Sequence, residues 1–166
     1  MGKTEKEIKE RLYALGADLC GIAGIDRFDG APEGYHPRDV LPSCQSVIVF
    51  ACRFPAGTLA CGSGVPYTVV RNILSDKMDK MAVQFCADME KLHILAVPIR
   101  TNGAERDKKT GRWRTIVSVK HAAQAAGLGT IGRNTLLLTP EYGSMVWLSL
   151  LLTELVLEAD DQKENI

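Results

Sequence analysis

The residues whose spacing most suggests a binding site lie in one glycine-containing segment. Three of its glycines match the Gly-x-Gly-x-x-Gly pattern of dinucleotide-binding loops: Gly127, Gly129 and Gly132. Such a loop follows a strand and opens a helix, so that free N–H groups at the helix N-terminus face the pyrophosphate. Here a helix-favouring run, residues 121–126, precedes the glycines, and an apolar, β-compatible run, residues 134–139, follows them. We therefore predict that Gly127 ends a helix and that the segment is not a pyrophosphate cradle.

Histidine and cysteine do not form a metal-ligating pattern in this sequence. His121 is the histidine nearest the glycines and can cap a helix, line a pocket or approach a metal, of which we expect a structural role. The five cysteines are widely spaced and form no Cys-x-x-Cys pair, which zinc sites and ferredoxin clusters commonly use. We therefore expect no metal site and no iron–sulfur cluster within this chain.

Size and charge describe one domain of ordinary length. The chain has 166 residues, of which 46% are hydrophobic, enough to form one sizeable core. We assign residues 1–158 to a single domain and residues 159–166 to a polar C-terminal tail. Twenty Lys and Arg residues balance twenty Asp and Glu residues, so there is no basic excess for a phosphate backbone. We expect no direct binding of nucleic acid.

No segment predicts export or membrane insertion. The charged N-terminal segment lacks the apolar core of a secretory signal. The longest apolar run, residues 145–153, is much shorter than the roughly 20 residues of a membrane-spanning helix. We expect a cytoplasmic protein without a membrane partner. Whether this run lies in the core or in a subunit interface, such as that of a homodimer, is left open.

The elements that must position the glycine segment alternate between helix and strand. The hydrophobic spacing predicts helices over residues 4–15 and 68–92, and strands over residues 18–23, 47–52 and 94–99. Residues 102–114 are polar, charged and punctuated by glycine, which predicts an exposed loop. The alternation indicates an α/β domain.

The string AGLGTIGRNTLLLTPEYGS, with the apolar run after it, resembles the corrinoid-binding domain of epoxyqueuosine reductases. The resemblance is densest over residues 120–158 and is fainter, in the same order, at GADLCGIAG, SVIVFAC and PYTVVRN. Epoxyqueuosine reductases and their reductive-dehalogenase relatives bind cobalamin in a nitroreductase-like domain, which a ferredoxin-like module with two 4Fe-4S clusters follows. The resemblance implies an oxidoreductase-like member of this iron–sulfur protein family, with a nitroreductase-like mixed sheet flanked by helices in a single domain.

The resemblance also implies a site for the cofactor. A corrin ring is broad, largely apolar and edged with amides, so it needs close backbone approach at glycines and polar groups at its rim. A tight helix-to-strand connection, or a helix start with exposed polar residues, explains the same residues without a ligand. The candidate cofactor-binding residues are His121, Gly127, Gly129, Gly132, Arg133, Asn134, Thr135, Tyr67, Arg71 and Asn72.

Two features depart from the family pattern. The resembled enzymes carry an acidic residue at a position that falls near Trp113, yet no Asp or Glu lies between Gly111 and Val119. Asp107 or Glu105 could replace this proton donor if the loop folds back, and the sequence identifies no catalytic residue. The chain also ends about where the resembled enzymes begin their ferredoxin module. Either the chain is a naturally short relative or a longer chain has been cut, and in both cases a ferredoxin-like electron donor is compatible with the resemblance.

Three functions are compatible with these residues. The leading one is a cobalamin-binding, reductase-like domain that depends on an external iron–sulfur donor and acts on an unknown small molecule. The alternatives are an FMN-binding nitroreductase-like protein and a non-catalytic accessory or cofactor-carrier module. Whether the chain is an enzyme is left open by the sequence.

Overall fold

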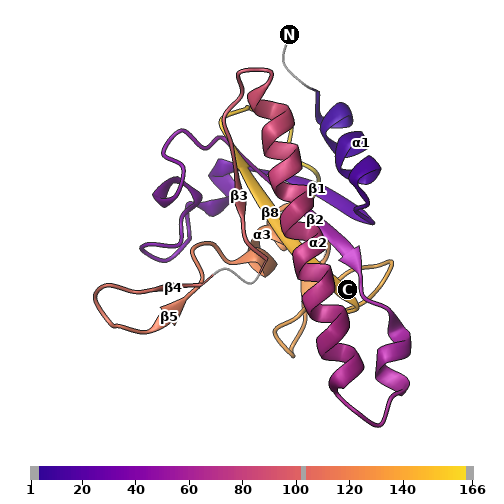
Figure 1. Ribbon diagram of the computed structural model, residues 1–166. Helices are drawn as coiled ribbons and strands as arrows, with labels where there is room; N and C mark the ends of the chain where they lie inside the picture. Colours follow the sequence, from indigo (N-terminus) through magenta and orange to yellow (C-terminus); the bar gives the residue numbers. More distant parts are fainter. Residues whose placement is uncertain (1–3, 102–103, 164–166) are drawn as a thin grey trace.

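The computed structural model describes residues 4–101 and 104–163, which form a central sheet with helices on both of its faces (Figure 1). The helices are α1 (Glu5–Leu15), α2 (Val65–Glu90) and α3 (Val119–Ala125). The main strands are β1 (Leu19–Gly24), β2 (Ser46–Arg53), β3 (Ala96–Ile99) and β8 (Val146–Thr153). Two short hairpins pair β4 (Glu105–Arg106) with β5 (Trp113–Arg114), and β6 (Thr130–Ile131) with β7 (Leu137–Leu138). Short 3-10 turns cover Ile25–Phe28, Pro37–Asp39 and Ala56–Ala60.

The sheet has the strand order β1-β2-β8-β3. Each neighbouring pair in it is antiparallel. The predicted α/β class, with helices flanking a sheet in one domain, is confirmed. We expected a mixed sheet, and among the described residues this sheet has no parallel pair.

Alternate residues of β2 and β8 face two separate cores. Ile48 and Leu151 pack under α1 and α2 on one face of the sheet. Val49 and Leu150 pack under α3 on the other face. All four side chains are fully buried, so the apolar run over residues 145–153 forms a central strand of this domain and does not need a subunit interface to bury it.

The ends of α1 follow directly from local sequence. Thr4 caps the helix through its side chain and exchanges hydrogen bonds with Glu7 in a capping box. Gly16 ends it in the left-handed conformation, with a φ of 107°. The predicted helix over residues 4–15 is confirmed.

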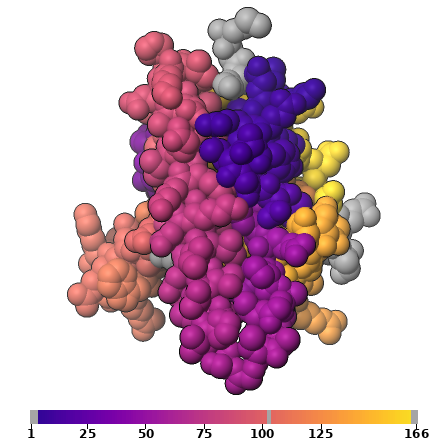
Figure 2. Space-filling view, turned by 45° about the vertical axis from the view of Figure 1, so that its right-hand side comes forward, coloured from indigo at the N-terminus to yellow at the C-terminus, as the bar shows by residue number. Residues whose placement is uncertain are grey.

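The segment over residues 102–114, predicted to be an exposed loop, is largely exposed where the structure describes it but contains a short hairpin. Residues 102–103 lie outside the described residues, and the remainder forms the β4–β5 hairpin, which projects from the body of the protein (Figure 1, Figure 2). The prediction missed this hairpin because each of its strands is only two residues long. Such strands carry no hydrophobic alternation.

The C-terminal segment, which we expected to be a polar tail, lies against β1 over part of its length. The Asp160 carboxylate accepts a hydrogen bond from Ile22 N at 2.8 Å and forms an ion pair with Lys9. Asp160 N donates to Ile22 O at 2.9 Å. No helix in the described part of the chain is long and apolar enough to cross a membrane.

The buried position of β8 predicts a large loss of stability from a cavity within it. Leu151→Ala should lower the free energy of unfolding by about 2 to 5 kcal/mol, because the side chain is fully buried between the sheet and the helices. Leu59→Ala is the matched control, since Leu59 is 65% exposed, and should change stability by about 0.5 kcal/mol or less. Urea denaturation measures both values. Equal losses for the two variants would contradict this account of the core.

Candidate functional site

The end of α3 positions the glycine segment. Gly127 has a φ of 73°, which glycine tolerates best. Its N–H donates to Gln124 O at 3.0 Å, and Leu128 N donates to Ala123 O at 3.0 Å. These two bonds form a Schellman motif. The prediction that Gly127 ends a helix is confirmed.

The requirement for glycine in this segment comes from the chain's own close packing. A Cβ atom at Gly127 would collide with Asp161 O, and one at Gly129 would collide with Leu138 O. A Cβ atom at Gly132 would approach the Leu138 side chain at 2.9 Å. Protein atoms therefore occupy the space beside these three glycines, and the structure explains them without a ligand.

Two polar residues after the glycines shape a tight turn. The Asn134 side chain accepts a hydrogen bond from Leu136 N at 3.2 Å. Thr135 has a φ of 64°, an unfavourable conformation for a β-branched residue. Thr135 O accepts a hydrogen bond from Lys120 Nζ at 3.0 Å. Arg133 is exposed, so the polar rim of the segment faces solvent.

A hollow of about 250 Å³ lies beside this turn, between α3, β7 and β8. Thr101 Oγ1 is buried there and has no hydrogen-bond partner among the described residues. An unpaired buried hydroxyl is unfavourable unless a ligand or water satisfies it. The residues that line the hollow are Thr101, Val119, Lys120, Leu136, Leu137, Ser144, Val146, Trp147 and Leu148.

Aromatic side chains connect the start of α2 to this hollow. Tyr67 packs on Phe54 with ring centroids 5.0 Å apart, and Phe54 packs on Trp147 at 6.0 Å. Trp147 Nε1 donates to Ser75 Oγ at 3.0 Å, which fixes the indole in the wall of the hollow. Tyr67 is therefore linked to the hollow through the Phe54 and Trp147 rings and is not among the residues that line it.

Arg71 and Asn72 lie further along α2. Arg71 Nη1 donates to Asn72 Oδ1 at 3.5 Å. No described contact joins either residue to the glycine segment, so their assignment to the site rests on the resemblance alone.

His121 lies beside a different cavity from the one that Lys120 lines. Its Nδ1 is 2.6 Å from Ser118 Oγ, and both residues line a cavity of about 620 Å³.

The described residues contain no cluster of three or more His, Cys, Asp or Glu side chains that could hold a metal ion. Burial raises the pKa of the Cys20 thiol to about 12 and that of Cys86 to about 11, so these thiols stay protonated at neutral pH.

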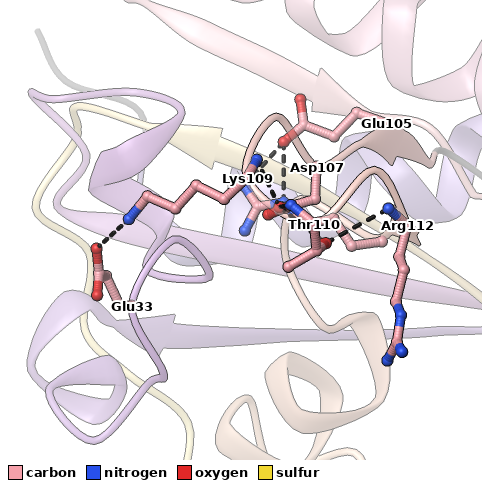
Figure 3. Close-up of polar contacts among 7 residues, drawn as sticks. Glu33, Glu105, Asp107, Lys109, Thr110 and Arg112 are labelled. Atoms are coloured by element: carbon pink, nitrogen blue, oxygen red, sulfur yellow. Dashed lines mark hydrogen bonds and ion pairs between the residues drawn. The ribbon is translucent and has the colours of Figure 1, made fainter.

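The acidic side chains of the hairpin, Glu105 and Asp107, contact other residues of the hairpin (Figure 3). The Asp107 carboxylate accepts hydrogen bonds from Thr110 N at 2.7 Å and from Lys109 N at 3.0 Å. The hydrogen bonds from Thr110 lower the pKa of Asp107, which keeps it ionised at neutral pH. Glu105 accepts from Arg114 Nη2 at 2.8 Å. Both carboxylates are thus engaged in contacts within the hairpin, and a replacement of the missing acid by either one stays a prediction.

Comparison of the sequence with characterised proteins identifies epoxyqueuosine reductases. The chain is 32% identical to that of Gloeobacter violaceus over 99% of its own length and 56% of the relative. It is 53% identical to that of Listeria monocytogenes over 96% of its own length and 41% of the relative. The chain thus spans about half the length of the relatives that it matches. No protein-family model matches it.

Comparison of the structure finds the same fold in two kinds of reductase. An epoxyqueuosine reductase crystallised with an epoxyqueuosine-modified tRNA-Tyr stem loop superposes with a TM-score of 0.65 and 20% identity, covering 98% of this chain and 48% of that chain. A reductive dehalogenase whose structure suggests a mechanism for B12-dependent dehalogenation superposes with a TM-score of 0.67 and 19% identity, covering 100% of this chain and 22% of that chain.

The stem-loop complex removes support for our expectation that nucleic acid is not a partner. A net charge of zero describes the whole chain, whereas binding depends on how the charges are distributed. The hairpin over residues 105–114 holds five basic side chains and two acidic ones. The net charge of the whole sequence does not show this local excess of basic over acidic residues.

Sequence and fold now agree over nearly the full length of the chain. The relatives found by sequence carry the same name as the solved enzyme with the same fold. The reductive dehalogenase extends the likeness to a second group of reductases. The chain is therefore an epoxyqueuosine-reductase/reductive-dehalogenase-like domain.

Proposed function

We propose that this reductase-like domain binds cobalamin and receives electrons from an external ferredoxin-like iron–sulfur protein. The observation that carries the proposal is the hollow between α3 and β8, where a buried threonine hydroxyl lacks a partner among the described residues. The B12-dependent reaction of the reductive dehalogenase with the same fold supports the choice of cofactor.

The side chains of the hollow fit the chemistry of a corrin. Leu136, Trp147 and Leu148 supply apolar surface, and Thr101 and Lys120 supply hydrogen-bonding groups. A corrin offers an apolar ring and amide side chains at its rim, which match these two kinds of group. A hollow of about 250 Å³ accommodates part of so large a cofactor, for example a rim amide.

Residues around the hollow would hold the cofactor in different ways. We assign Thr101 and Lys120 to hydrogen bonding with rim amides, and Trp147 to packing against apolar surface. Arg133, Asn134 and Thr135 border the same turn and would contact the rim. Cobalamin, when bound, supplies a cobalt centre that takes up and releases electrons. The described residues would orient the cofactor and exclude water.

Two other functions remain alternatives. An FMN-binding nitroreductase-like protein would use the same sheet and loops, and an accessory or cofactor-carrier module would bind a cofactor without catalysis. The visible spectrum separates the first alternative from our proposal, because FMN gives a yellow protein and cobalamin a red or orange one. An accessory or cofactor-carrier module would show no turnover when a ferredoxin is added, which separates this second alternative from our proposal.

Removing the Thr101 hydroxyl should have opposite effects on cofactor affinity and on stability. Thr101→Val should weaken cobalamin binding about tenfold, because it removes a hydrogen bond to the cofactor. In the cofactor-free protein it should raise the free energy of unfolding by about 1 kcal/mol, because an unsatisfied buried group disappears. Thr58→Val is the control, since the Thr58 hydroxyl is exposed and already donates to Pro55 O.

Titration with cobalamin, followed by its visible spectrum under reducing conditions, measures the affinities. The wild type should show a saturable spectral change, and Thr58→Val should match it. A wild type that shows no saturable change, or that binds FMN and not cobalamin, would contradict the proposal. Equal cobalamin affinity of Thr101→Val and the wild type would remove the hollow from the site.

We further propose that the β4–β5 hairpin contacts RNA. Trp113 is 73% exposed between Arg112 and Arg114. The hairpin's acidic side chains are engaged internally, so the charges of Lys108 and Arg112 face solvent without an acidic partner among the described residues. Exposed aromatic rings stack on unpaired bases, and basic side chains bind phosphates. The tRNA stem loop bound by the epoxyqueuosine reductase supports this choice of ligand.

Charge and stacking in the hairpin predict two separable effects on RNA affinity. Trp113→Ala should weaken binding of a tRNA stem loop about tenfold at any salt concentration, because a stacking contact is lost. Arg112→Gln should lower the slope of log affinity against log salt concentration by about one, because one phosphate contact is lost. Lys6→Gln is the control, because Lys6 is an exposed residue of α1, outside the hairpin, and is paired with Glu10. Fluorescence anisotropy over a salt series measures these values, and unchanged binding in both hairpin variants would refute the assignment.

A further inference from the structure

The cavity beside His121 is separate from the hollow assigned to the cofactor. Its walls come from the segment after β1, from α3 and the residues before it, and from the C-terminal segment. Ser118 and His121 line this cavity, whereas Val119 and Lys120 line the hollow. The first turn of α3 thus divides the two. The cavity volume of about 620 Å³ is in the range of small-molecule sites.

Arg27 holds the walls of this cavity together. Its Nη1 donates to Ala125 O at 2.6 Å and to Asp160 O at 2.6 Å. These bonds join the segment after β1 to the end of α3 and to the C-terminal segment. Both acceptors are carbonyl oxygens, and Arg27 forms no ion pair within residues 4–101 and 104–163. A half-buried guanidinium without a carboxylate partner favours an anion beside it.

Other lining groups point to the same kind of ligand. His121 uses Nδ1 for Ser118 and leaves Nε2 without a partner among the described residues. Gln124 uses Oε1 to accept from Ile131 N at 2.9 Å, which leaves its amide NH₂ to donate. None of the lining residues is Asp or Glu. When the Ser118 hydroxyl donates to Nδ1, His121 Nε2 carries the ring proton, so Arg27, His121 and the Gln124 amide all offer donors to an anion.

The remaining walls are apolar and aromatic. Phe28 is buried beneath the cavity, and Pro32 and Val117 line its sides. The Tyr35 ring is held from outside by Arg114, whose guanidinium carbon lies 5.0 Å from the ring centroid. Arg114 is neutralised by Glu105, so this contact orients the ring without adding a free charge. An apolar body of ring size matches these walls.

We propose that this cavity binds a small organic carboxylate with an apolar body. The carboxylate lies against Arg27, His121 and the Gln124 amide, and the apolar part packs on Phe28 and Tyr35. The proposal does not depend on cobalamin, because the two sites use different side chains. It adds a second ligand site to the domain.

The test uses the cofactor-free protein and cyclohexanecarboxylate as the probe. Titration followed by ¹H–¹⁵N NMR should shift the amide signals of residues 118–125 saturably. Cyclohexylmethanol, the neutral analogue, should bind at least about tenfold more weakly, because it forms no charge-assisted hydrogen bond. Cyclohexyl phosphate, which keeps a negative charge, shows whether the site is specific for carboxylate.

Two variants place the binding event in this cavity. Ala31→Trp fills the cavity and should abolish the shifts, and His121→Phe should weaken binding about tenfold without filling it. Ala56→Trp, at an exposed position outside the cavity, should bind the probe like the wild type. Absence of saturable shifts, tighter binding of the phosphate than of the carboxylate, equal binding of the neutral analogue, or wild-type affinity in His121→Phe would each overturn the proposal. Because no cobalamin is present, these outcomes are independent of the cofactor titration.

Discussion

The pairing of β2 with β8 is the constraint on which the rest of the structure depends. Eight residue pairs align from Ser46↔Thr153 to Arg53↔Val146, and both faces of the ladder are covered. Because side chains alternate across a strand, this register sends one set to α1 and α2 and the other set to α3. A shift by one residue would exchange the two sets, which differ in size and shape. The position of α3, and with it both candidate sites, follows from this register.

α3 approaches the sheet closely because its inner face is built of alanine. Ala122 and Ala123 are fully buried against the core that contains Val49 and Leu150. The Schellman motif at Gly127 then turns the chain back, and the C-terminal segment closes over that turn. The same short helix consequently borders the hollow assigned to cobalamin and the cavity assigned to an organic anion.

Much of this arrangement could be predicted from the sequence, because the signals were local. Helix α1, the central strands and the helix end at Gly127 each have a cap, an apolar run or a glycine that determines them. The need for glycine at position 129 could not be predicted, because it comes from the carbonyl oxygen of Leu138, nine residues later, which leaves no space for a Cβ atom. Likewise, periodicity does not show that the Thr101 hydroxyl has no hydrogen-bond partner within residues 4–101 and 104–163, or that Lys120 and His121 line different cavities. These features arise from tertiary contacts, which the pattern of residue types does not encode.

A crystal structure of the protein grown with cobalamin would test directly whether the hollow between α3 and β8 holds the cofactor. We expect a corrin against Trp147 with a rim amide within hydrogen-bonding distance of Thr101 Oγ1. A corrin bound to another surface of the protein would contradict this assignment.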